Sequence, residues 1–319
     1  MKDRLPGLAL VAVLTAVAWF VAAGIDLVGA VLTGLVLGLV VGNAVRLPGA
    51  MRSGISYGGK QVLELAIVFL GFGISFTTLS GLGWQTGLLL AVVVFGMVPV
   101  SIVLSRVIGC KGTTGYLVGF GTAICGSSAI AALAPDISDD EEDAGVAIAV
   151  VNLLGLVGML ALPAVLPLLH LTDVQAGTLL GGSLQAVGNV AGAGYAMNDT
   201  VGEVAVATKL GRVALLTPGL LLARTLLQRG QGGLSFKLPP YLWAFIAVTV
   251  LVSVVSLPAD LLDVLKTMGK VLLTAAMTAI GLKMSLRDLV DKGGTALVFG
   301  ALLFVLQGGL VLVALLLFF

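Results

Sequence analysis

Long apolar runs recur along the whole chain, separated by short polar stretches. A transmembrane helix needs about 20 consecutive, mainly apolar residues, with a range of about 17–25. Eleven runs come near this length, and they predict an all-α polytopic membrane protein with about 11 transmembrane helices. The predicted spans are residues 7–24, 27–45, 61–79, 87–105, 115–136, 145–169, 176–198, 203–224, 240–257, 266–283 and 295–318.

The N-terminal run could be read as a signal peptide, since a basic start precedes an apolar stretch. We favour a first transmembrane helix, because the run is long and a second one follows almost at once. The predicted spans 115–136 and 176–198 differ from the others in being rich in glycine. These two could be broken helices or re-entrant pairs.

The composition supports lipid as the solvent of this chain. Hydrophobic residues make up 59% of the sequence and charged residues only 10%. Soluble domains contain about 45–50% apolar and about 25% charged residues, so a soluble protein of this composition could not cover its surface. The 44 glycines fit close packing of membrane helices. We therefore expect a single transmembrane domain over 1–319, with repeat halves at about 27–136 and 176–319.

The basic residues predict the orientation. With a cytoplasmic N-terminus and eleven alternating spans, thirteen of the seventeen basic residues fall on the cytoplasmic side. The acidic run 136–143 then falls outside, and so does the C-terminus. This is the positive-inside bias of membrane proteins, and it predicts a multi-pass protein with its N-terminus in the cytoplasm.

Two internal similarities indicate repeats. GKQVLELAIVFLGFGISFTTL from Gly59 matches GKVLLTAAMTAIGLKMSLRDL from Gly269. The predicted spans run these copies in opposite directions, which is typical of secondary transporters. Chance similarity between two apolar helices is the alternative. A weaker match joins GYLVGFGTAICGSSAIA from Gly115 to GTLLGGSLQAVGNVAGA from Gly177, and the same spans run these copies in one direction.

The segment GFGTAICGSSAIAALAP, 119–135, is the strongest candidate for a binding site. Its glycines weaken the helix at mid-membrane, and each costs about 1 kcal/mol against Ala. If the helix breaks near Gly126, Ser127 or Ser128 can cap the second half. The free N–H groups of that half then offer an anion site without a charged side chain. The alternative is a continuous helix whose small residues pack against a neighbour. The candidate residues are Gly121, Thr122, Cys125, Gly126, Ser127 and Ser128.

The second glycine-rich segment, 181–199, repeats this logic. Its centre falls near Gly188, with Asn189 beside it and Gln185 one turn earlier. Two amide side chains at mid-membrane are costly unless they are paired. They would bind substrate, or they would form a hydrogen bond to a neighbouring helix.

Two cations, Lys209 and Arg212, lie inside the predicted span 203–224. They are three residues apart and therefore share one face of the helix. A cation near the bilayer centre costs roughly 2.5–3.5 kcal/mol on insertion scales. No acidic residue of an adjacent span is an obvious partner, so an anionic ligand would explain both. The alternative places both cations at the membrane interface, in a span that starts later.

The other polar residues give weaker indications of a binding site. Glu64 could pair with Lys60, and Asn152 could bond a neighbouring helix or line a cavity. The single histidine, His170, excludes a histidine metal cluster, and a disulfide between the two cysteines is not expected. Nothing resembles a P-loop, so this chain is not expected to hydrolyse ATP or to hold a cofactor.

These motifs resemble those of a known family. GFGTAICGSSAIAALAP, ATKLGRVALLTP at 207–218 and AMTAIGLKMSLRDL at 276–289 are similar to the YeiH family of bacterial inner-membrane proteins, also called the sulfate exporter family. The resemblance covers nearly the whole chain. It implies a transporter with inverted repeats, broken crossing helices and an elevator-like mechanism.

The chain departs from the family pattern at one point. Where the resemblance leads us to expect a His-Glu pair, this chain has Gln185-Ala186, and Asn189 stands where a Gln is expected. A histidine there could couple transport to protons. Its absence argues against proton coupling at that position.

The sequence thus predicts a secondary transporter that exports a small anion, sulfate or an organosulfonate, by alternating access. Its expected partners are that anion, a coupling ion (H⁺ or Na⁺), the lipid bilayer and, by analogy, a second copy in a homodimer, with no nucleic acid. A passive anion channel is the main alternative. An intramembrane enzyme that uses Ser127, Ser128 or Cys125 is a remote one, because no base lies within reach and the chain is not expected to be an enzyme.

Overall fold

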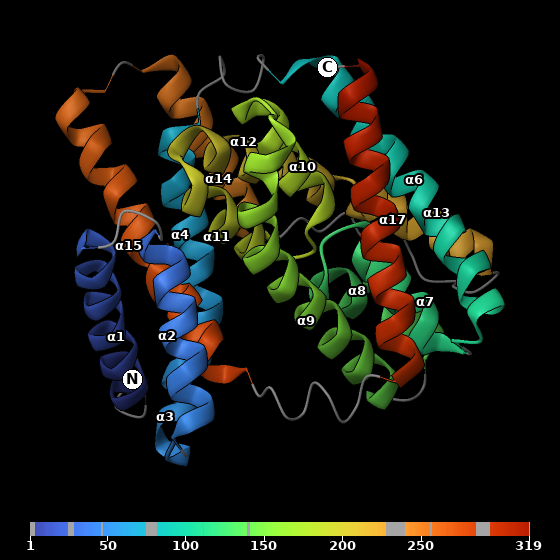
Figure 1. Cartoon of the computed structure of the whole chain (residues 1–319), viewed down its shortest axis with the longest axis horizontal. Coiled ribbons are helices and arrows are strands. Elements are labelled where there is room, and N and C mark those ends of the chain that lie inside the picture. The colour runs from blue at the N-terminus through green and yellow to red at the C-terminus, as the bar shows by residue number, and fades with distance from the viewer. Residues whose placement is uncertain are drawn as a thin grey trace. The chain divides into compact units, whose positions relative to one another are not determined.

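The computed structural model describes residues 4–24, 29–45, 47–74, 82–110, 112–138, 141–227, 240–255, 257–284 and 294–318. Every regular element in these ranges is a helix (Figure 1), which confirms the all-α fold. The chain divides into two compact units, each built from separate stretches of sequence. Both units draw on both of the expected repeat halves, so their boundaries differ from those of the halves.

Unit 1 comprises 1–81, 191–203 and 239–286. Its helices are α1 (Leu5–Gly24), α2 (Ala30–Ala44), α3 (Gly49–Tyr57), η2 (Gly58–Val62), α4 (Leu63–Leu70), η3 (Gly71–Gly73), α14 (Pro240–Val254) and α15 (Ala259–Lys283).

Unit 2 comprises 82–190, 204–238 and 287–319. Its helices are α6 (Gly83–Ile108), α7 (Thr113–Ala123), α8 (Ser127–Ile137), α9 (Glu141–Val165), η4 (Leu166–Leu169), α10 (Asp173–Ser183), α13 (Leu216–Leu227) and α17 (Gly294–Phe318). Helices α11 (Val187–Met197) and α12 (Asp199–Ala214) each contribute residues to both units.

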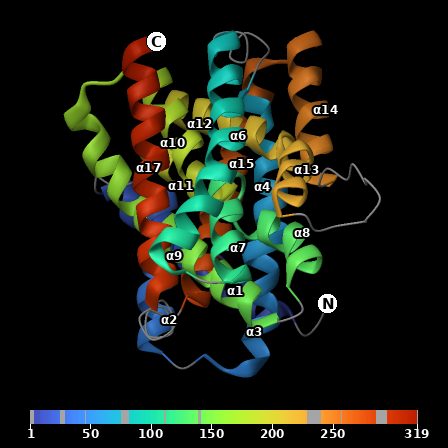
Figure 2. The same ribbon diagram turned by 90° about the vertical axis from the view of Figure 1, so that its right-hand side faces the viewer.

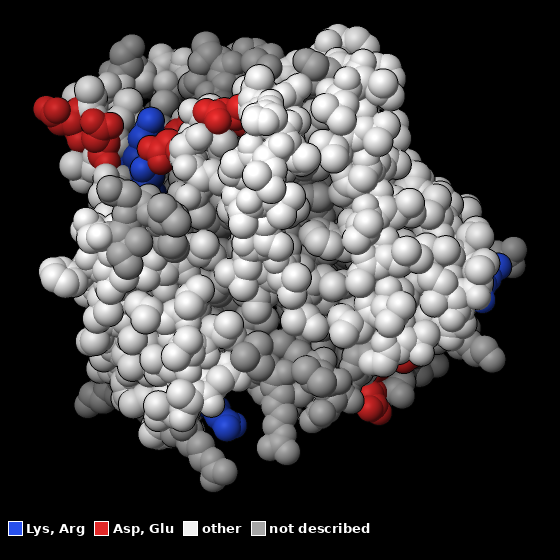
Figure 3. Space-filling view, in the orientation of Figure 1, with Lys and Arg blue, Asp and Glu red and all other residues white. Residues whose placement is uncertain are grey.

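Six described helical stretches are long and apolar enough to cross a membrane, and α12 with α13 forms a seventh, bent by 45°. The shorter α2 and α14 are also apolar. These helices make the chain a multi-pass membrane protein. Figure 3 shows that the middle of α9 and α17 carries no charged side chain on the visible face. The predicted count of eleven spans is not confirmed, and the two glycine-rich segments, each of which consists of two short helices, account for part of the difference between the two counts.

Close helix packing in unit 1 depends on glycine. Helix α2 places Gly34, Gly38 and Gly42 at intervals of four residues against α15. A methyl group added at Gly38 would collide with the carbonyl oxygen of Thr278. Such spacing of small residues lets two membrane helices approach each other closely.

The described part of the first sequence repeat lies in unit 1, where its copies fall in η2–α4 and α15. Gly59 lies against Ile280, and Gly269 lies against Leu70. The two copies therefore pack antiparallel, as the predicted inverted repeat requires. The ends of the two matched segments, from Ser75 and from Ser285, lie outside the described residues.

The segment 115–136 is a hairpin and not a single span. Thr113 at the start of α7 and Ser138 after α8 both donate a hydrogen bond to Asp143, and Thr114 donates to the same carboxylate. The two ends of the hairpin therefore lie together, and the chain enters and leaves the membrane on one side.

This hairpin corrects the predicted orientation of the acidic run 136–143. Arg224, expected in the cytoplasm, forms an ion pair with Asp136, expected outside, at 2.7 Å. Because 115–136 turns back instead of crossing, Asp136 returns to the side from which α7 started. The other residues of the run that the structure describes follow directly after it.

The segment 176–198 is also broken, because α10 ends at Ser183 and α11 begins at Val187. Gly181 of α10 lies against Ala205 and Thr208 of α12, and the carbonyl oxygen of Leu184 accepts from Lys209, so the end of α10 packs against α12. Within unit 2, α10 lies above α7 and α8 in Figures 1 and 2.

The weaker repeat is thereby explained. Both of its copies are broken at their centres, and α9 crosses the membrane between them as one long span. Because the first copy returns to its starting side before α9 crosses, α7 and α10 start on opposite sides, so the copies are inverted. The eleven-span assignment ran them in one direction because it counted 115–136 as a crossing.

Candidate functional site

The turn between α7 and α8 and the break between α10 and α11 lie together, and we call them the tips of the first and the second hairpin. The helices α7, α8, α10 and α11 have 11 residues each. At 1.5 Å per residue they are about 16 Å long, which is half of the roughly 30 Å hydrocarbon core. A Cβ atom added at Gly126, in the first tip, would lie 3.6 Å from Gln185 in the second.

Glycine shapes the first tip, as the sequence predicted. Gly126 has φ 75°, a conformation that L side chains rarely adopt, and it immediately precedes α8. Its N–H donates to the carbonyl oxygen of Gly121 at 2.8 Å, which closes the turn. A side chain at Gly121 would collide with Ile130, so this glycine lets α7 and α8 approach each other.

The serines of this tip do not cap the helix, contrary to the prediction. Gly126 occupies the N-cap position and offers no side chain, while Ser127 and Ser128 are the first two helical residues. Ser127 donates to Oδ1 of Asn152 at 2.8 Å, and Ser128 donates to Cys125. The N–H groups of Ala129 and Ile130 donate to the carbonyl oxygen of Gly126, whereas those of Ser127 and Ser128 lack the usual capping side chain.

Lys209 reaches the C-terminal ends of α7 and α10. Its ammonium group donates at 2.7 Å to the carbonyl oxygen of Ile124 and at 2.7 Å to that of Leu184. The side chain is fully buried. These carbonyl groups follow α7 and α10 directly, so one ammonium ion joins the two hairpin tips.

Arg212 lies one helical turn further along α12 and joins the same two ends. Its Nη1 donates to three carbonyl oxygens of the second hairpin and its Nη2 to two of the first, at 2.8–3.2 Å. The acceptors are Gly181, Gly182 and Leu184, and Thr122 and Ala123. Nε has no partner, and the side chain is fully buried.

The two cations are thus neither interfacial nor unpaired. The sequence analysis found no acidic partner for them and considered no other protein group. Main-chain carbonyl groups at the end of a helix carry a partial negative charge of about −0.5 and can balance a cation instead. Each charged hydrogen bond contributes about 1.5–3 kcal/mol. Together the bonds to Lys209 and Arg212 offset the cost of burying them.

Gln185 is a buried polar side chain without hydrogen-bond partners at this site. It is fully buried, and neither its Nε2 nor its Oε1 has a hydrogen-bond partner. Asn189, 8% exposed, lies beside it, and a Cβ atom added at Gly155 of α9 would collide with the Asn189 amide. Gly155 therefore leaves room for both amides.

Thr122 and Cys125 occupy the interior of the first tip. The hydroxyl of Thr122 donates to the carbonyl oxygen of Val118 at 2.8 Å, so it is not available to a ligand. Cys125 is 5% exposed and accepts from Ser128 through its sulfur. In contrast Ser128 and Asn152 are exposed, so the polar groups of the site extend from an exposed rim to a buried end.

Gln307 of α17 is a site residue that the sequence analysis missed. It is fully buried, and its Nε2 donates to the carbonyl oxygens of Gly182 and Ser183 at 3.0 and 3.1 Å. Its Oε1 has no partner. A single amide in the middle of an otherwise apolar span, 294–318, was the signal that could have found it.

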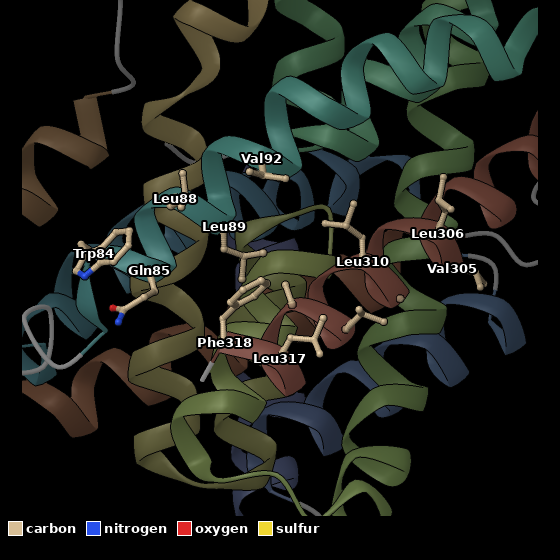
Figure 4. Close-up of a pocket in the computed structure, with 13 residues that line it drawn as sticks. Trp84, Gln85, Leu88, Leu89, Val92, Val305, Leu306, Leu310, Leu317 and Phe318 are labelled. Atoms are coloured by element: carbon tan, nitrogen blue, oxygen red, sulfur yellow. The ribbon is translucent and has the colours of Figure 1, made fainter.

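Two other features lie apart from this chemistry. In the described part of the chain, no group of three potential metal ligands comes together. A groove of about 820 Å³ lies between α6 and α17 (Figure 4), and its lining is apolar except for Gln85 and the indole nitrogen of Trp84. Such a lining offers no charged group to an anion.

Comparison with known proteins places the chain in a family. The family model Conserved hypothetical protein 698 matches residues 6–300. A UPF0324 membrane protein of Corynebacterium glutamicum is 30% identical over 299 residues, covering 92% of this chain and 86% of that protein. One of Lactiplantibacillus plantarum is 29% identical over 313 residues, covering 94% and 93%. No solved structure matches the chain. The chain therefore belongs to the Conserved hypothetical protein 698 family of UPF0324 membrane proteins, which is the YeiH family that its motifs resemble.

Proposed function

We propose that this protein is a secondary transporter that exports a small anion, such as sulfate or an organosulfonate, across the bacterial inner membrane. The observation that carries the proposal is the excess of positive charge where the hairpin tips meet. Lys209 and Arg212 contribute two full charges, while the ends of α7 and α10 offset about one. The N-termini of α8 and α11 add about one more.

Among the described residues, no acidic side chain forms an ion pair with either cation. The segments that form the tips, 112–135, 174–190 and 204–227, contain neither Asp nor Glu. A site with an excess of about two positive charges in a low-dielectric interior favours a mono- or dianion. The side chains of Lys209 and Arg212 would not contact the anion, because they already donate to carbonyl oxygens at the ends of α7 and α10. Their role would be to make the electrostatic potential of the site more positive.

The groups that would contact the anion lie on the other side of the breaks. They are the N–H groups of Ser127 and Ser128 at the start of α8, the first N–H groups of α11, the hydroxyls of the same two serines and the amides of Gln185 and Asn189. Half-helix N-termini at the middle of the membrane bind anionic groups in other secondary transporters. The unpartnered amide of Gln185 supports a ligand at this position.

Alternating access in an elevator-like manner fits the division of the chain. All of the proposed contacts belong to unit 2, so one compact body carries the whole site. The proposal includes a cytoplasmic N-terminus, a homodimer and no enzymatic activity. A passive channel would use the same residues without alternating access.

Counterflow in proteoliposomes tests the proposal. Vesicles are loaded with unlabelled sulfate, methanesulfonate or chloride, and the uptake of external ³⁵S-sulfate is followed. A transporter gives saturable uptake that at least one internal anion accelerates. Uptake that stays proportional to concentration would indicate a channel, and the absence of any flux with this panel would overturn the proposal.

Two variants connect the flux to the site. Asn189→Leu removes an amide of the proposed contact set and should abolish uptake. Gly145→Ala, on α9, introduces a methyl group into open space and should leave uptake unchanged. Equal uptake by the Asn189 variant would contradict the assignment of the site.

A further inference from the structure

Six main-chain carbonyl oxygens converge on the two buried cations of α12. Three belong to the end of the first hairpin arm, α7, and three to the end of the second, α10. Leu184 is shared, because its oxygen accepts from both Lys209 and Arg212. A charged nitrogen therefore sits between two helix C-termini that point at each other.

Converging carbonyl oxygens are the ligands that small monovalent cations use in proteins. In ion channels they replace the hydration shell of the ion, and in secondary transporters the C-terminal ends of half-helices coordinate Na⁺. The two bonds of the Lys209 ammonium, each 2.7 Å long, occupy the place that such an ion would take.

We infer that the carbonyl groups of Ile124 and Leu184 form a monovalent-cation site that the protein fills with the ammonium group of its own Lys209. The side chain is fully buried, so a free ion would have to displace it. A tethered ammonium also acts at a high effective concentration, which favours it over a free cation. Arg212 holds the adjacent carbonyls in place.

The consequence concerns the driving force. If the cation position is permanently filled, the anion moves without a cotransported Na⁺, driven by its own gradient, by the membrane potential or by exchange for another anion. This consequence rests on the proposed function. The occupied cation site does not, because it can be tested by the stability of the protein alone.

Chemical rescue of Lys209→Ala tests the site. The substitution removes three carbons and an ammonium group, which propylammonium chloride can replace. Melting temperatures in detergent are compared in propylammonium, sodium and choline chloride at equal ionic strength, with 1-propanol as the uncharged analogue. We expect the variant to melt below the native protein and to recover by about 5 °C in saturating propylammonium.

The matched control is Lys270→Ala, because Lys270 pairs with the carboxylate of Asp199 and lies partly exposed. Neither this variant nor the native protein should respond to propylammonium. A folded Lys209→Ala protein that responds no more than the Lys270 variant would overturn the inference. Rescue by 1-propanol to the same extent would do so too, since it would show that only volume is restored.

A measurement on the native protein covers the case in which Lys209→Ala does not fold. We expect no saturable binding of ²²Na⁺ to the native protein and no stimulation of ³⁵S-sulfate uptake when Na⁺ replaces choline. Saturable ²²Na⁺ binding would show an open cation site and would refute the inference. If sulfate is not transported at all, the measurement of ²²Na⁺ binding still tests whether the cation site is occupied.

Discussion

Thr113 and Ser138 lie at the same end of the α7–α8 hairpin, because both hydroxyl groups donate to the carboxylate of Asp143. The hairpin consequently reaches the middle of the membrane from one side only. Its N-terminal arm presents carbonyl groups to the centre, and its C-terminal arm presents N–H groups. One re-entrant segment thus supplies both a negative and a positive helix end at the same depth.

The hairpin predicts that residues before and after it are accessible from one side of the membrane. Arg106 near the end of α6 and Glu142 near the start of α9 are both exposed. Each is replaced by Cys in a Cys110→Ser, Cys125→Ser background and labelled with a membrane-impermeant maleimide. We expect both positions to label in the same type of vesicle, right-side-out or inside-out. Labelling in opposite types would mean that 115–136 crosses the membrane.

The native Cys110 should react slowly with the same reagents. It is 6% exposed and lies in the loop between α6 and α7. Burial raises the pKa of the Cys110 thiol, because the thiolate is desolvated. Since the thiolate is the nucleophile, alkylation in a Cys125→Ser protein should be about tenfold slower than that of free cysteine near pH 7. The rate should still be rising at a pH where free cysteine has reached its maximum, and a plateau at the same pH as free cysteine would contradict this.

Removal of Arg212 should destabilise the protein strongly. Arg212→Met leaves carbonyl groups of both hairpin tips without donors, and breaking a buried charged network costs about 3–5 kcal/mol. Arg224→Met is the matched control, because Arg224 forms a more exposed ion pair with Asp136 and its loss should cost about 1 kcal/mol. Melting temperatures in detergent provide the comparison. Equal shifts for the two variants would show that the carbonyl network does not hold the tips together.

The helix breaks could be predicted from sequence, but the direction of the chain after each break could not. Gly126 and the glycines near 188 mark places where a membrane helix is weak. An apolar arm of eleven residues on either side of a break has the same composition whether the chain continues or turns back. The α7–α8 segment is seen to turn back because Thr113 and Ser138 both donate to Asp143. The spacing of these three residues in the sequence does not predict that contact.

The depth of Lys209 and Arg212 was also predictable, whereas their partners were not. Charged residues in an apolar span stand out against their neighbours. Main-chain carbonyl groups exist at every position, so no sequence pattern shows which of them face a cation. The search for acidic partners therefore left both cations unpaired, although helix ends provided acceptors. Predictions from side chains alone fail wherever the backbone supplies the chemistry.

A methyl group added to α9 beside the Gln185 and Asn189 amides should reduce transport more than a methyl group added elsewhere on α9. In Gly155→Ala the new methyl group would collide with the Asn189 amide, and overpacking of this kind costs about 1–3 kcal/mol. We expect ³⁵S-sulfate uptake to fall at least tenfold, because the amide must move. The matched variant Gly145→Ala meets no atom within 4 Å and should retain native uptake and stability. Native uptake by the Gly155 variant would place the anion elsewhere.

Substitution of Gln185 should affect the stability of the protein and its transport activity in different ways. Its amide is fully buried without partners, and an unsatisfied buried polar group costs about 1–3 kcal/mol. Gln185→Leu removes that penalty while nearly preserving volume, so the variant should melt at the same temperature as the native protein or higher. It should nevertheless lose ³⁵S-sulfate uptake and any stabilisation by sulfate, since the amide is expected to contact the anion. A residue that merely fills space could not produce this combination. If the leucine variant instead melts lower and keeps its uptake, Gln185 supports the fold and the anion site must be sought away from the hairpin tips.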